Sequence, residues 1–197
     1  MRVTAVVGSY RREGIIESAV DAILDSALEE GAEVQKINLL DSEVEFCTNC
    51  RACMQEPGPE RGDCPIDDDM RNILNQLEDS DAFVLASPMN FGTVTALMKR
   101  FIERLICYGY WPWGKLPKER QKEKSKRAVL VASCAAPGWI ARWTTDIVKV
   151  MKKPARLLGA GKVHVLFIGG AAREKHSGLT EKHRKKARKL GKKLAAS

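Results

Sequence analysis

The side chains with the most distinctive chemistry in this sequence gather in one short segment. Four of the six cysteines, Cys47, Cys50, Cys53 and Cys64, lie between residues 47 and 64. The first three follow the spacing C-x2-C-x2-C, which lets a loop wrap three thiolates around one corner of a cubane iron–sulfur cluster. Cys64 is separated from Cys53 by a Pro/Gly-rich gap of ten residues and supplies a fourth thiolate. The pattern predicts a [4Fe–4S] cluster.

Other uses of these thiols stay open. Four thiolates also bind zinc, but tetrahedral zinc sites favour two separated C-x2-C knuckles. A cysteine loop without any metal is a second alternative, and we expect it in preference to zinc. Disulfides are rare where thiols are kept reduced. The N-terminal residues begin a strand pattern at once, with no signal-peptide h-region, so we expect a cytoplasmic protein with free thiols.

Composition places the chain among globular proteins. Its 197 residues are 44% hydrophobic and 29% charged, which predicts one domain spanning 1–197 with a cysteine-rich loop at 47–64. The sequence contains no run of eighteen apolar residues, which is about the length that a membrane span needs. The net charge of +8 comes from residues 171–197, where ten Lys and Arg face two Glu. Apolar residues at helical spacing in this segment predict a docked terminal helix with a solvated basic face, and nucleic-acid binding is not expected.

Short apolar runs alternate with amphipathic stretches along the chain. We expect strands at residues 3–8, 33–40, 82–87, 127–133 and 163–170, with helical spacing between them. Asp67 is expected to cap the second helix, and Pro154 to kink or end the helix before the last strand. This alternation predicts an α/β fold with a five-stranded, doubly wound parallel sheet and helices on both faces. In such folds ligands bind beyond the carboxyl ends of the strands.

Two of the strand-end loops carry residues that suit a ligand. The first reads Gly-Ser-Tyr-Arg-Arg-Glu-Gly from Gly8, and Gly14 opens a helix whose N terminus suits a phosphate. It is neither a Walker A sequence nor G-x-G-x-x-G. The other is the loop after the third expected strand, called the third loop below. It reads Ser-Pro-Met-Asn-Phe-Gly from Ser87, and the helix behind it carries Lys99 and Arg104. Pro88 stiffens this turn, and Gly92 allows a close approach to a flat ring.

Taken together, these loops resemble those of the NAD(P)H-dependent FMN reductase and iron–sulfur flavoprotein family. The resemblance implies a flavodoxin-like fold, FMN as the cofactor and a cysteine loop between the second strand and second helix. It places the FMN phosphate at Ser9, Arg11, Gly14, Ile15 and Ile16. The isoalloxazine ring is expected over Pro88, Met89, Asn90, Phe91 and Gly92, with Ser133, Cys134 and Ala135 closing its other side. The implied metal ligands are Cys47, Cys50, Cys53 and Cys64.

The function implied is that of an FMN-dependent oxidoreductase in which the cluster exchanges electrons with the flavin. NAD(P)H is a candidate electron donor. The cysteine loop is expected at the same sheet edge as the flavin loops, and no side chain is expected to act as a catalytic acid or base. A homodimer or homotetramer is implied, with the aromatic stretch 108–115 as an interface, and a ferredoxin or a small molecule as redox partner. The alternatives are an NAD(P)H-dependent FMN or quinone reductase without a cluster, and a non-enzymatic electron carrier.

Overall fold

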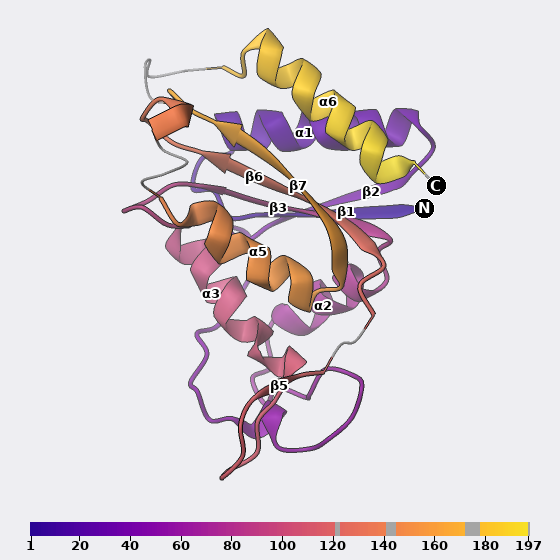
Figure 1. Ribbon diagram of the computed structural model, residues 1–197, viewed down its shortest axis with the longest axis vertical. Coiled ribbons are helices and arrows are strands. Elements are labelled where there is room, and N and C mark those ends of the chain that lie inside the picture. The colour runs from indigo at the N-terminus through magenta and orange to yellow at the C-terminus, as the bar shows by residue number, and fades with distance from the viewer. Residues whose placement is uncertain (121–122, 141–144, 172–177, 197) are drawn as a thin grey trace.

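The computed structural model describes residues 1–120, 123–140, 145–171 and 178–196. Figure 1 shows a central sheet covered by helices on both faces. The strands are β1 (Arg2–Val7), β2 (Glu33–Asn38), β3 (Ala82–Pro88), β4 (Gly109–Tyr110), β5 (Lys118–Glu119), β6 (Lys126–Ser133) and β7 (Ala160–Ile168). The α-helices are α1 (Ile15–Glu29), α2 (Met70–Glu78), α3 (Ala96–Arg104), α5 (Ile147–Leu157) and α6 (Glu181–Ala195), and two short 3-10 helices are η1 (Ala52–Met54) and η2 (Leu105–Tyr108).

The main sheet is parallel, with strand order β2-β1-β3-β6-β7. This is the flavodoxin-like order, whose switch point lies between β1 and β3. The α/β fold class, the five strands and the helices on both faces are therefore confirmed. The carboxyl ends of β1 and β3, where the two predicted flavin loops begin, are hydrogen-bonded neighbours.

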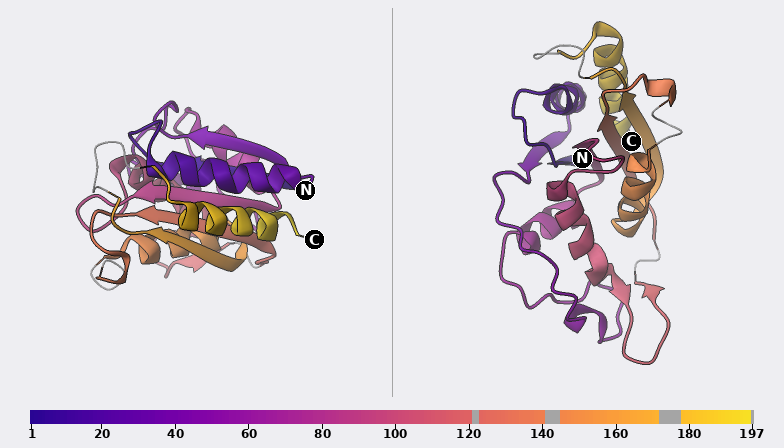
Figure 2. Two further views of the ribbon diagram at one scale, coloured as in Figure 1. Left: turned by 90° about the horizontal axis from the view of Figure 1, so that it is seen from above. Right: turned by 90° about the vertical axis from the view of Figure 1, so that its left-hand side faces the viewer.

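Successive residues of each buried strand point to opposite faces of the sheet, and each face has its own hydrophobic core. In β3, Phe83 and Leu85 point toward α2, α3 and α5, whereas Val84 and Ala86 point toward α1 and α6. Helices α1 and α6 lie side by side on one face, as Figures 1 and 2 show. Both faces of the sheet are buried, which explains why its central strands read as continuous apolar runs.

Three sequence expectations concerned helix boundaries. The terminal helix α6 docks through Ala187, Leu190 and Leu194, as predicted. Pro154 does not end α5, which continues to Leu157. Asp67 does not cap α2: the helix begins at Met70, whose N–H donates to the Asp68 carboxylate over 3.1 Å. Asp68 and Asp69 instead accept from the backbone N–H groups of residues 45 and 43, which ties α2 to the incoming chain.

The cysteine loop (residues 47–64) and the aromatic hairpin (residues 109–119, with β4 and β5) lie together at one end of the molecule, beyond α3 (Figures 1 and 2). Trp111 N–H donates to the Met54 carbonyl over 2.9 Å, and Gly62 N–H to the Cys107 carbonyl over 2.9 Å. The first bond joins the two segments, and the second ties the cysteine loop to η2 at the end of α3. None of the helices in the described part of the chain has the length and apolar character needed to cross a membrane.

Candidate functional site

The first and third loops are joined by one threonine. Thr95 caps α3, with its Oγ1 accepting from Met98 N–H, and the same hydroxyl donates to the Gly8 carbonyl over 2.6 Å. Ser87 Oγ accepts from Thr95 N–H over 3.1 Å. All of these groups are buried within the sheet edge. The two predicted flavin loops are therefore held in a fixed relation to each other.

The first loop leaves the N terminus of α1 open. Gly14 is the N-cap residue in an extended conformation, and within the described residues no side chain caps the helix. The free N–H groups and positive dipole end of such a helix attract an anion. The Ser9 hydroxyl accepts from Arg11 N–H over 3.1 Å and folds the loop back on itself. Arg12 pairs with Asp41, whereas Arg11 is exposed and has no ion-pair partner among the described residues.

The two isoleucines of this loop contribute differently. Ile16 is buried in the core between the sheet and α1, and Ile15 is half-buried beside it. Their side chains therefore fix the helix against the sheet, and only their backbone N–H groups suit a phosphate.

The third loop forms a tight turn. Asn90 and Thr93 exchange two backbone hydrogen bonds of 2.9 and 3.0 Å, and Phe91 and Gly92 between them have φ of 46° and 81°. Gly92 meets this left-handed conformation without a Cβ penalty. The turn is held to the rest of the edge because Met89 N–H donates to the Ser133 carbonyl over 2.8 Å. The Phe91 ring stands fully exposed at its tip.

The loop after β6 continues the same edge. Cys134 is buried, its N–H donates to the Ile168 carbonyl, and its thiol donates to the Ala136 carbonyl over 3.2 Å. Burial raises the pKa of this thiol, which stays protonated. Ala135 is exposed and Ser133 is buried. Of the three residues predicted here, Ala135 is therefore the one that presents its side chain outward.

All four predicted ligand cysteines line a single pocket. Cys47, Cys50, Cys53 and Cys64 share it with Arg104 and the apolar side chains of Met54, Ile66 and Ile106. Cys53 is buried, Cys47 and Cys64 are half-buried, and Cys50 is exposed. The loop curls through left-handed conformations at Asn49 and Arg51, with φ of 54° and 63°. The sequence spacing thus brings the thiols together as predicted.

Neighbouring thiols in this pocket affect one another's pKa values. Burial, reinforced by the neighbouring Cys64, Cys47 and Cys50, raises the pKa of Cys53 to about 11. Hydrogen bonds from Ala52 N–H and from Thr48 lower the pKa of Cys50. A set of thiols that resist joint ionisation gains stability when a cation takes up the thiolates.

The pocket is nevertheless tight. Its free volume of about 10 Å³ holds about one water molecule. No three Cys, His, Asp or Glu side chains in the described ranges are placed to hold one metal ion. The number, chemistry and common pocket of the thiols fit a cluster, but their side chains must turn before they can ligate one.

The long gap before Cys64 is closed by a glycine. A Cβ on Gly62 would lie 1.7 Å from the Cys53 carbonyl oxygen, so only glycine lets the chain return past Cys53. Its N–H bond to the Cys107 carbonyl fixes the return from the other side. Residues 54–63 therefore form an ordered loop that brings Cys64 back to the other three thiols.

Two arginines that hold this loop were missed as site residues. Arg120 is buried, and its guanidinium donates to the carbonyls of Cys53 over 3.1 Å, Glu56 over 2.7 Å and Gly109 over 2.9 Å. Arg104 forms a buried ion pair with Asp68 and contacts Cys64. Arg120 lies outside any recognisable motif, whereas Arg104 was part of the Lys-x-x-x-x-Arg pattern and gave a usable signal.

The expected position of the cysteine loop was only half right. The chain leaves the sheet at the carboxyl end of β2, and Figure 1 shows that it then runs past the far end of α3. The four cysteines line a pocket there with Arg104 and Ile106. Helix α3 has nine residues and a rise of about 1.5 Å per residue, so roughly 13 Å separates the third loop from Arg104. The cysteines are thus one helix length from the flavin loops and do not share their edge.

Comparison with known proteins gives the family. The profile of the family described as NADPH-dependent FMN reductase matches residues 1–152. The chain belongs to this family. An iron-sulfur flavoprotein of Archaeoglobus fulgidus is 36% identical over 112 residues, which cover 57% of this chain and 49% of that protein. The chain spans about half the length of the curated relatives that it matches.

Solved structures agree on the fold. An NAD(P)H:quinone oxidoreductase from Methanothermobacter marburgensis superposes with a TM-score of 0.73 at 18% identity, covering 98% of each chain. An FMN-dependent NADH-azoreductase from Bacillus anthracis, in complex with FMN, gives 0.73 at 13% identity and covers 100% of each. The predicted resemblance to the FMN reductase family is confirmed by the profile match, and the solved structures agree with the predicted fold.

Proposed function

We propose that this chain is a single flavin-binding domain that works in the cytoplasm as an FMN-dependent oxidoreductase. The observation that carries this proposal is the Thr95 hydroxyl, which fixes the first loop to the third at the switch point between β1 and β3. Family membership supplies the cofactor class, and the open N terminus of α1 supplies a phosphate site. The flavin, when bound, supplies the hydride and electron chemistry.

In this proposal each loop has its own task. Arg11 and the N–H groups of Gly14, Ile15 and Ile16 bind the phosphate, and the Ser9 hydroxyl holds the loop in shape. The turn from Pro88 to Gly92 presents its backbone and the Phe91 ring to the isoalloxazine. Ser133, Cys134 and Ala135 limit the site on the other side, with the Cys134 thiol held neutral by burial.

We further propose that Cys47, Cys50, Cys53 and Cys64 hold a [4Fe–4S] cluster, which supplies one-electron transfer. The shared pocket and the iron-sulfur flavoprotein named among the relatives support this. The flavin, the cluster and an NAD(P)H donor would let the protein connect two-electron and one-electron partners. A homodimer or homotetramer, with a ferredoxin or a small-molecule acceptor, completes the proposal.

The alternative is a reductase of FMN or a quinone in which the thiols hold no metal. The tight pocket and the absence of a preformed metal-ligating set among the described residues favour this alternative. It predicts the same flavin site and the same NAD(P)H oxidation, without iron.

Two neighbouring arginines offer a direct test of the flavin site. Arg11→Gln removes the cation proposed for the phosphate, and Arg12→Gln removes an equal charge that Asp41 already engages. Titration with FMN, followed by flavin fluorescence, is expected to show about tenfold weaker binding for Arg11→Gln, or about 1.4 kcal/mol, and little change for Arg12→Gln. Equal, unchanged affinities in both variants, or no FMN binding by the wild type, would contradict the proposed site.

A further inference from the structure

The guanidinium of Arg104 is almost completely enclosed. Its side chain is 2% exposed and that of its ion-pair partner Asp68 is 3% exposed. Burying such a pair is costly unless the remaining donors are also satisfied. Arg104 satisfies them with groups on both sides of the cysteine loop.

Arg104 joins the residues that flank the cysteine loop. One nitrogen donates to the Glu45 carbonyl over 3.0 Å, and the other donates to Asp68 Oδ1 over 3.1 Å. Glu45 N–H also donates to the Asp68 carboxylate over 2.7 Å. Glu45 lies two residues before Cys47, and Asp68 lies four residues after Cys64. A single guanidinium therefore draws together the start and the end of a long loop, against the entropy of loop closure.

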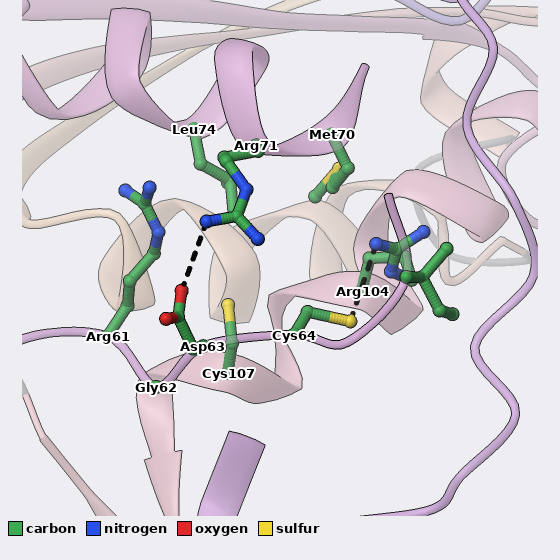
Figure 3. A pocket seen from close by; sticks show the side chains of 10 residues that line it. Arg61, Gly62, Asp63, Cys64, Met70, Arg71, Leu74, Arg104 and Cys107 are labelled. Atoms are coloured by element: carbon green, nitrogen blue, oxygen red, sulfur yellow. Dashed lines mark hydrogen bonds and ion pairs between the residues drawn. The ribbon is translucent and has the colours of Figure 1, made fainter. Parts of the chain in front are cut away.

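The same guanidinium contacts a thiol. Arg104 Nη2 donates to Cys64 Sγ over 3.5 Å, and Figure 3 shows the two groups facing each other. Cys64 lines two adjoining pockets: one holds the other three ligand cysteines, and the second holds Cys107. Arg104 lines both pockets. The contact between Arg104 and Cys64 therefore lies where the two pockets meet. At this point either Cys64 or Cys107 could serve as the fourth thiol of the cysteine site.

We propose that Arg104 is the positioning residue of the cysteine site: it closes the loop through Glu45 and Asp68 and holds Cys64, not Cys107, as the fourth thiol. This inference rests on the proposed function where it concerns a bound cluster. A planar fork can serve a carbonyl, a carboxylate and a thiol at once, which a lysine ammonium cannot do in this geometry. Its N–H bond to sulfur also raises the reduction potential of a bound cluster.

The test compares two paired variants. Arg104→Gln with Asp68→Asn removes the clasp, by which we mean the bonds from Arg104 to Glu45 and Asp68 that close the loop, without leaving a buried carboxylate unpaired. Arg71→Gln with Asp63→Asn makes the same charge changes in an exposed pair that lines the neighbouring pocket and, among the described residues, forms no hydrogen bond with a thiol. Arg104→Lys is the second variant, should the first not fold. Circular dichroism and FMN binding confirm that each protein is folded.

Three readouts follow anaerobic reconstitution with iron and sulfide. Loss of iron to a chelator is expected to be about tenfold faster without the clasp, and tryptic cleavage within residues 47–64 of the metal-free chain at least as strongly accelerated. The cluster potential of Arg104→Lys is expected to shift to a more negative value. The Arg71/Asp63 pair is expected to match the wild type throughout.

The inference fails if a folded Arg104 variant loses iron, is cleaved and is reduced as the wild type is. A wild type that takes up no iron contradicts the proposed cluster instead. In that case the tryptic cleavage alone decides the role of Arg104: accelerated cleavage in the variant supports the clasp, and unchanged cleavage overturns it.

Discussion

The hydroxyl of Thr95 donates a hydrogen bond of 2.6 Å to the carbonyl oxygen of Gly8. Thr95 is the N-cap residue of α3, behind the third loop, and Gly8 follows β1 at the start of the first loop. Because the same hydroxyl also caps α3, one side chain fixes both loops that we propose bind the flavin. The geometry of the site therefore depends on a residue that need not touch the cofactor.

Replacing Thr95 tests this dependence. Thr95→Val keeps the shape but removes the cap and the bond to Gly8, so we expect a loss of about 1–2 kcal/mol in the free energy of unfolding and weaker FMN binding. Thr95→Ser keeps the hydroxyl and is expected to lose far less of both. Urea unfolding and FMN titration measure the two effects. Equal behaviour of the two variants would show that the hydroxyl does not matter.

Gly62 makes a second prediction. Since an added Cβ would lie 1.7 Å from the Cys53 carbonyl oxygen, Gly62→Ala must displace the chain leading to Cys64. We expect a loss of several-fold in the iron retained after reconstitution, with FMN binding preserved. Gly178→Ala, at a position with open space around it, is the matched control. Iron retention equal to that of the control would contradict the proposed return path.

Arg51 links the cysteine loop to the aromatic hairpin. Its guanidinium carbon lies 4.0 Å from the centre of the Trp111 ring and 3.9 Å from that of Trp113, and it donates to the Trp111 carbonyl over 2.6 Å. We expect Arg51→Ala to shift tryptophan emission to longer wavelength and to lower the free energy of unfolding by about 1–2 kcal/mol. Arg51→Lys keeps the charge and is expected to lie between Arg51→Ala and the wild type. An unshifted spectrum in Arg51→Ala would rule out the stack in solution.

Cys107 predicts a pH dependence of stability. Burial, with a smaller effect of Cys53, raises the pKa of this thiol to about 12. Because the unfolded thiol ionises near pH 8.5, its burial stabilises the fold below that pH, and this contribution is lost as the pH rises toward 12. We expect the unfolding free energy of the metal-free wild type to fall more steeply than that of Cys107→Ala, by about 1.4 kcal/mol per pH unit. Denaturant unfolding at pH 8, 9 and 10 compares the slopes, and parallel slopes would contradict the burial of Cys107.

Much of the fold was predictable from the sequence because both faces of the sheet are covered. Continuous apolar runs such as residues 82–87 mark buried strands, and the spacing of Ala187, Leu190 and Leu194 marks a docked helix. The prediction that Asp67 caps α2 was wrong because three aspartates in a row make the local signal for the capping residue ambiguous. Asp68 is engaged by Arg104, a partner 36 residues away that local pattern does not reveal.

The site was predictable where it depends on short spacing and not where it depends on tertiary contacts. The spacing of Cys47, Cys50 and Cys53 indicated a loop wrapped around a shared pocket, and the pocket is present. The chain leaves the sheet at the predicted edge, but the thiols lie farther away because Arg104 and Arg120 anchor the loop to the far end of α3. The assigned flavin contacts stay predictions that FMN titration tests.

The measurement that tests the account most directly is anaerobic purification followed by a visible spectrum, with analysis of iron and acid-labile sulfide per chain. The account predicts flavin absorbance together with a broad shoulder near 400 nm and about four iron per chain, as a [4Fe–4S] cluster requires. Flavin absorbance without iron would contradict the cluster and leave a reductase with an unmetallated cysteine loop. A protein that stays colourless when FMN is added would contradict the flavin site itself.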